Sequence, residues 1–115
     1  MYPTLNTKKP TDKMLQTMLN ACENAQIENW NDLKPLVSGE LSNFLLMLTW
    51  IKDMKQKQEM GIEQARVYVD IQKTTARNKL MVLPGLDVIK VDNILNQSVD
   101  SIRKDIFDYI GWVII

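Results

Sequence analysis

The stretch from residue 40 to 81, ELSNFLLMLTWIKDMKQKQEMGIEQARVYVDIQKTTARNKLM, decides the fold of this chain. Its apolar residues recur at alternating spacings of three and four, which is the pattern of a helix that buries one stripe against other helices. The residues of this stripe are Leu41, Phe44, Leu48, Ile51, Ile62, Ala65, Val69 and Ala76. The sequence therefore predicts an all-α fold organised around this segment.

Gly61 determines whether the stretch is one helix or two. The glycine follows a lysine-rich turn, as glycines at helix C-termini often do. A continuous helix over residues 38–82, capped by Ser38, is the favoured interpretation. The apolar stripe keeps its phase across Gly61, no Ser, Thr, Asp or Asn follows to cap a new helix, and a glycine inside a helix costs only about 1 kcal/mol. A hairpin broken at Gly61 is the alternative.

A clear helix boundary follows this stretch. Pro84 lacks the backbone donor that a helix needs and Gly85 comes directly after it, so the long helix must end just before them. Asp87 is placed to cap a last helix over residues 87–113, whose apolar residues are regularly spaced.

The N-terminal part predicts a shorter helix. Thr11 can cap a helix over residues 11–28, and residues 1–10 are expected to form a flexible arm. Residues 29–39 are rich in turn-forming residues but also apolar, which predicts an ordered loop with at most one short helical turn. Together these segments predict one domain over residues 11–115. We expect an elongated bundle of three helices, or four if the long helix is broken, completed by oligomerisation.

Composition narrows the functional classes. The 115 residues carry 14 basic and 14 acidic side chains, so the net charge is zero and no overall field attracts nucleic acid. Cys22 is the single cysteine, which favours a reducing, cytoplasmic location. The most apolar run is far shorter than the roughly 20 residues that a membrane span requires. We expect no membrane span.

The residue types that support catalysis are scarce. The sequence has no histidine, and its four glycines form no phosphate-binding loop. One cysteine without histidine also excludes a structural zinc site. We therefore predict no enzymatic activity, no catalytic or metal-binding residues and no cofactor.

An interface with another protein is the favoured functional prediction. The run around residues 44–51 is apolar nearly all round, and the C-terminal tail is apolar as well, so both need more burial than one helix stripe gives. We predict a scaffold or adaptor that forms a homo-oligomer or binds another protein. The predicted interface residues are Phe44, Leu45, Met47, Leu48, Trp50, Ile51, Trp112, Val113 and Ile114.

A small nucleic-acid-binding regulator is the alternative prediction. Residues 66–79 concentrate basic side chains that can reach phosphates, namely Arg66, Lys73, Arg77 and Lys79. The same residues can instead form ion pairs on a solvated helix surface. The sequence leaves both interpretations of this basic strip open.

Overall fold

The computed structural model describes residues 10–25 and 27–115, and it is 79% helical. Its helices are α1 (Pro10–Glu23), α2 (Trp30–Gln56), α3 (Ile62–Met81), α4 (Val88–Ser101) and α5 (Arg103–Ile110). No strand occurs in the described residues, so the prediction of an all-α fold is confirmed. The flexible arm was predicted over residues that, apart from Pro10, lie outside the described ones. None of the five helices is long and apolar enough to cross a bilayer.

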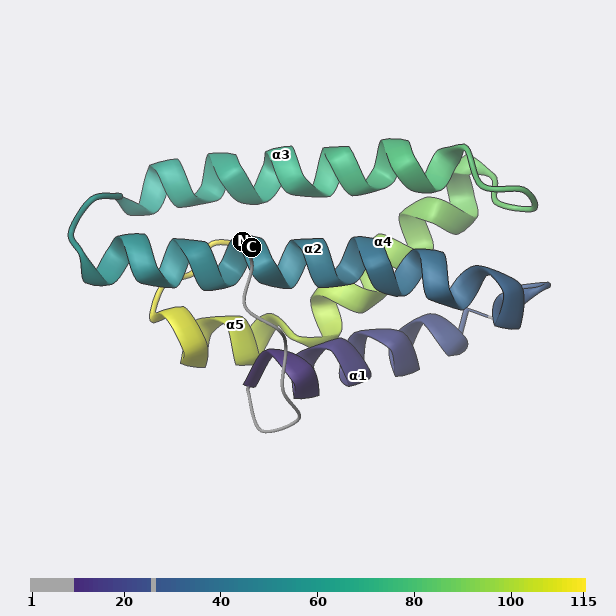
Figure 1. The fold of residues 1–115 in the computed structure, drawn as a ribbon, viewed down its shortest axis with the longest axis horizontal. Helices are drawn as coiled ribbons and strands as arrows, with labels where there is room; N and C mark the ends of the chain where they lie inside the picture. Colours follow the sequence, from purple (N-terminus) through teal and green to yellow (C-terminus); the bar gives the residue numbers. More distant parts are fainter. Residues whose placement is uncertain (1–9, 26) are drawn as a thin grey trace.

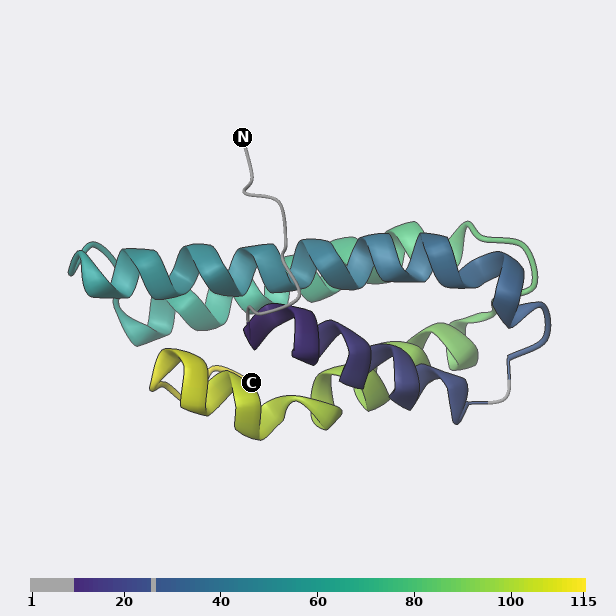
Figure 2. The same cartoon turned by 60° about the horizontal axis from the view of Figure 1, so that its bottom comes forward.

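The helices pack in two layers. Helices α2 and α3 lie side by side and antiparallel (Figure 1), and α1, α4 and α5 form a second layer against them (Figure 2). The fold measures 43 × 28 × 27 Å, whereas a continuous helix over residues 38–82 has a length on the order of 60 Å. The continuous helix and the elongated bundle are therefore wrong, and the hairpin alternative describes the chain.

The turn between α2 and α3 shows why the chain reverses. Gln58 adopts a left-handed conformation with φ of 59°, and its N–H donates to the carbonyl of Lys55. The N–H of Glu59 donates to the carbonyl of Met54, which completes a Schellman motif and ends α2. Gly61 instead precedes α3, where its N–H donates to Oε1 of Gln64. The missing Ser, Thr, Asp or Asn cap thus did not exclude a new helix, since glycine is tolerated at the N-cap.

Helix α2 begins earlier than predicted. Residues 30–39 are helical although Pro35 lies within them, and Ser38 is an interior residue rather than a cap. Leu33 and Val37 are buried, at 5% and 0% exposure, and extend the inward stripe of α2 toward its N-terminus. The predicted loop is wrong because this burial outweighs the turn propensity of the local sequence.

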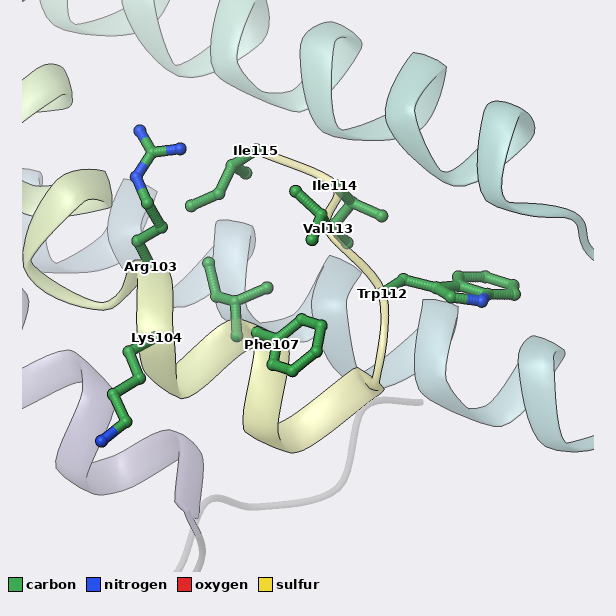
Figure 3. Close-up of a pocket in the computed structure, with 8 residues that line it drawn as sticks. Arg103, Lys104, Phe107, Trp112, Val113, Ile114 and Ile115 are labelled. Atoms are coloured by element: carbon green, nitrogen blue, oxygen red, sulfur yellow. The ribbon is translucent and has the colours of Figure 1, made fainter.

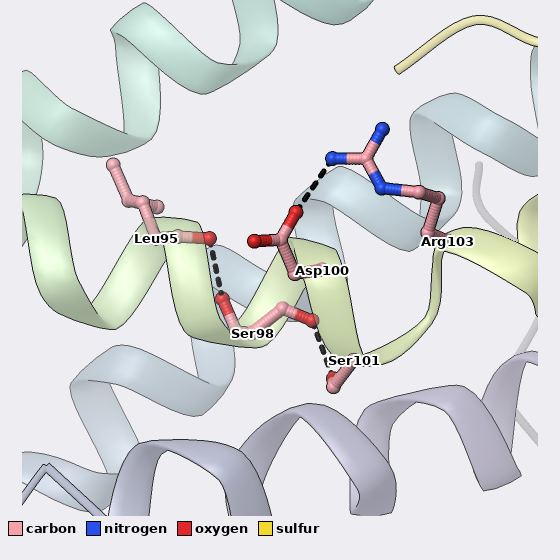
Figure 4. Close-up of polar contacts among 5 residues, drawn as sticks. All are labelled: Leu95, Ser98, Asp100, Ser101 and Arg103. Atoms are coloured by element: carbon pink, nitrogen blue, oxygen red, sulfur yellow. Dashed lines mark hydrogen bonds and ion pairs between the residues drawn. The ribbon is translucent and has the colours of Figure 1, made fainter.

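The predicted last helix is interrupted at Ile102. Ser98 Oγ donates to the carbonyl of Leu95 at 3.1 Å, and Ser101 Oγ donates to the carbonyl of Ser98 at 2.6 Å (Figure 4). The N–H of Ile102 donates to the carbonyl of Val99, a tight i to i−3 bond that ends α4. Serine side chains that bond to nearby carbonyls are known to bend helices. The break lets α5 change direction while Ile102 stays fully buried.

Other helix ends agree with the sequence more closely. Asp87 caps α4 as predicted, since its Oδ1 accepts from the N–H of Lys90 at 2.8 Å. Helix α1 ends at Glu23 rather than near residue 28, and the following chain turns so that Ile27 packs in the core. Helix α5 ends at Ile110, because Gly111 takes a left-handed conformation with φ of 85°.

The core lies between the two layers. The inward stripes of α2 and α3 meet the apolar sides of α1, α4 and α5, and these side chains have almost no exposed surface. The largest fully buried residues are Met18, Leu41, Leu45, Leu48, Ile51, Leu80, Ile94, Ile102 and Ile106. With one side of the hairpin covered in this way, its other side faces away from the second layer.

Candidate interaction surface

The outward side of the hairpin carries a groove between α2 and α3, here called the outer groove. Its lining comes from both helices and combines large apolar side chains with polar ones. The lining residues are Asn43, Leu46, Met47, Trp50, Tyr68, Ile71, Gln72, Thr75 and Lys79. Trp50, Tyr68 and Ile71 are 40%, 41% and 55% exposed. Large apolar side chains with this much exposure, gathered on one surface, are typical of interaction sites.

Helical spacing explains why these side chains gather there. On α2, Asn43, Leu46 and Trp50 follow three-and-four spacing, and they lie opposite the buried stripe that includes Phe44 and Leu48. The same spacing brings Tyr68 and Ile71 to the outward side of α3. The outer groove is therefore lined by a second set of side chains on each helix, among which Trp50, Tyr68 and Ile71 are large and exposed.

Trp50 and Tyr68 join the two helices across the groove. Their ring centroids are 4.9 Å apart and the rings are nearly perpendicular, at 89°. Such edge-to-face pairs contribute about 0.5–1.5 kcal/mol beyond the area that they bury. The pair holds two large aromatic side chains in fixed positions while leaving part of each ring exposed.

Charges near the outer groove are paired within the chain. Of the described residues that line it, Lys79 alone is charged, and its Nζ lies 3.8 Å from Oε2 of Glu40. Further along α2, Lys57 Nζ and Asp53 Oδ2 are 2.9 Å apart. The Asp53 carboxylate raises the pKa of Lys57, chiefly through a hydrogen bond. The groove thus presents a mixed apolar and uncharged polar surface whose one charge is compensated.

The predicted interface residues divide into two groups. Most of them are covered by their own chain and contribute to the core: Phe44, Leu45, Leu48, Ile51 and Ile114. Met47 and Trp112 are half-buried, whereas Trp50 and Val113 are exposed. The predicted interface must therefore be corrected, because only the second group has surface to offer a partner. Met47 and Trp50 belong to the outer groove.

The C-terminal tail packs on its own chain. Lys55 Nζ donates to the carbonyl of Ile110 at 2.6 Å and lies 5.0 Å from the ring centroid of Trp112. Arg66 Nε donates to the carbonyl of Val113 at 3.1 Å, and Ile114 is 4% exposed. These contacts fix the tail beside α5 and the α2–α3 turn.

An apolar hollow remains between the tail and α5. Figure 3 shows Phe107 of α5 facing it, with Val113 and Ile115 of the tail on its other side. Phe107 and Val113 are 49% and 58% exposed. This hollow is another exposed apolar region among the described residues.

The basic strip does not form one surface. Arg77 Nε lies 2.8 Å from Oδ1 of Asp92 on α4, and this hydrogen-bonded carboxylate raises the pKa of the guanidinium. Lys73 is half-buried and lines a hollow between α3 and α4, to which Arg77 and Asp92 also contribute. Arg66 binds the tail, while Lys79 lines the outer groove on the opposite side of α3. Three of the four predicted phosphate-binding cations thus have partners within the chain.

Cys22 is the one cysteine and it is fully buried. Loss of hydration raises the pKa of its thiol from 9.0 to about 11, an effect that the neighbouring Ser98 hydroxyl partly opposes. The thiol is protonated at neutral pH and inaccessible, which is the behaviour of a core residue rather than a nucleophile. Among the described residues no cluster of His, Cys, Asp and Glu could hold a metal ion.

Two central residues of the outer groove were missed by sequence reasoning. Tyr68 and Ile71 lie off the stripe that contains Ala65 and Val69, and so do not extend its three-and-four pattern. Their offset was itself a signal, since apolar residues outside the buried stripe of an amphipathic helix point to a second contact surface.

The chain has no match in the comparisons with known proteins. A scan against protein-family models finds none, and searches among curated proteins and among solved structures also find none. Its function has to be inferred from its own geometry.

Proposed function

We propose that this protein is a non-enzymatic helical interaction module that works as a scaffold or adaptor through protein–protein contacts at the outer groove. The observation that carries this proposal is the exposure of Trp50, Tyr68 and Ile71 on a layer whose inner side is already filled by the same chain. Tryptophan and tyrosine are the residue types that most often dominate binding energy at protein interfaces. A groove between two helices also suits an apolar helix face from a partner.

Nucleic-acid binding through the basic strip receives less support. Arg77 is engaged with Asp92 and Arg66 with the tail, so binding phosphate means breaking contacts inside the chain. The strip also lacks the continuous positive surface that nucleic-acid recognition uses. Salt-dependent binding to duplex or single strands, lost in Lys73→Ala, would favour this alternative over the proposed module.

The single cysteine supports a reducing compartment for the module, and we place it in the cytoplasm. A test of the proposed function is affinity purification of the tagged chain from the cells that make it. Ile71→Glu places a charge in the outer groove, and Ile89→Glu is the matched control at a 71% exposed position on α4. We expect Ile71→Glu to lose proteins that the unmodified chain and Ile89→Glu both retain. Identical sets of bound proteins from all three would contradict the proposal.

A further inference from the structure

We infer that the occupant of the outer groove is a second copy of this chain, which packs its own outer groove against the first across a two-fold axis. This inference rests on the proposed function and names the partner. In such a dimer the two α2–α3 hairpins face one another, so that four helices enclose a second core between the chains.

Charge favours a second copy over a charged partner. Glu40 and Asp53 are paired with Lys79 and Lys57 within the chain, so the groove has no uncompensated charge to select an acidic or basic ligand. The whole chain is also neutral, with 14 basic and 14 acidic residues. Two copies therefore approach without net repulsion.

The available area fits a stable dimer. A 20-residue helix such as α3 is about 30 Å long, and two helices packed side by side present a layer about 20 Å wide. The projected area is about 600 Å², which is about three quarters of the roughly 800 Å² per partner of a standard interface.

The surface has the relief that self-association needs. Trp50, Tyr68 and Ile71 project from it, while half-buried Leu46 and Met47 lie lower in the groove. A two-fold axis brings the projections of each copy to the groove of the other. Methionine at Met47 can adjust its rotamer to the incoming side chains.

The test is the solution mass of the complete chain, measured by light scattering at about 100 µM, a concentration about 100 times a 1 µM Kd. We expect twice the chain mass of 13.3 kDa for the unmodified protein and for Ile89→Glu. Ile71→Glu and Tyr68→Glu should run at the mass of one chain. Ile71→Ser, which adds no charge, should weaken the dimer, and circular dichroism shows whether each variant is folded.

A mass of one chain for the unmodified protein overturns this inference. So does a dimer that persists in folded Ile71→Glu and Tyr68→Glu. A monomer that still loses a bound protein through Ile71→Glu overturns the second copy alone and leaves the proposed function standing. If Ile71→Glu changes neither the mass nor the bound proteins, both fail.

Discussion

Both faces of the α2–α3 hairpin carry large apolar side chains, but one face packs in the core and the other is exposed to solvent. On the inner face Leu48 and Ile51 are completely buried, whereas on the outer face Trp50 and Ile71 are 40% and 55% exposed. Residues 48, 50 and 51 are sequence neighbours, so apolar character alone does not separate the two faces. Helical phase does, because it buries one face in the core and leaves the other exposed to solvent.

A cavity on the inner face should cause the largest loss of folding stability. Leu48→Ala removes a fully buried side chain, and we expect it to lower the free energy of unfolding by about 3–5 kcal/mol. Leu46→Ala is the matched change on half-buried Leu46 in the outer groove and should cost about 1 kcal/mol. Urea unfolding of both variants measures the difference. Equal losses would show that the two faces are not distinct.

Alkaline pH should destabilise the layer that covers the inner face. The pKa of the Cys22 thiol is about 11 in the folded chain, against 9.0 ordinarily, so the folded state keeps this proton longer than the unfolded state. The stability from this difference is present below about pH 9 and is lost as pH rises through 11, by about 3 kcal/mol in total.

Cys22→Ala isolates this effect, because both chains share every other group that titrates in the same range. Unfolding free energies of the two proteins, measured between about pH 8 and pH 11, should converge as pH rises. A constant difference would mean that the thiol ionises alike in the folded and unfolded states.

Glycine in place of Gln58, in the turn between α2 and α3, should stabilise the fold. Gln58 adopts a left-handed conformation that disfavours side chains with a Cβ, so Gln58→Gly should raise stability by about 1 kcal/mol. In a continuous helix the same change lowers stability by about 1 kcal/mol. Thermal unfolding gives the sign, and Gln56→Gly, at the last residue of α2, should be destabilising in either case. A lower melting temperature for Gln58→Gly would contradict the hairpin, and with it the existence of two faces.

The smallest change in folding stability should come from the outer face. Ile71→Ser alters a 55% exposed side chain, and we expect the free energy of unfolding of the monomer to change by no more than about 0.5 kcal/mol. Chemical unfolding at low protein concentration, where self-association does not contribute, is the measurement. A loss as large as that of Leu48→Ala would show that Ile71 belongs to the core.

Much of the fold could be predicted from the sequence at positions where one local signal dominates. Pro84 with Gly85 ended a helix, Asp87 capped the next one, and the stripe from Leu41 to Ala76 gave the buried face correctly. At the α2–α3 turn the local signals conflicted. The left-handed position is filled by Gln58 rather than glycine, and the apolar phase is the same for one helix or two.

Only part of the candidate site could be predicted from the sequence, because the exposure of a side chain depends on which helices cover its face. The sequence singled out residues around 44–51, yet Leu45 is buried by the second layer while Trp50 is not. Tyr68 faces Trp50 only because the chain reverses at the turn. A continuous helix keeps those two rings far apart, so the outer groove could not be predicted before the hairpin was known.

The bonds that hold the C-terminal tail also set an order of events during folding. Lys55 reaches a carbonyl 55 residues later in the chain, and Arg66 reaches one 47 residues later, whereas α2 and α3 meet through a short turn. Contacts between sequence neighbours form faster than contacts that close long loops. The hairpin therefore forms before the contacts that hold the tail. In that interval α1, which is also close to α2 along the chain, can pack on the inner face, while the part that α4 and α5 cover stays open to solvent.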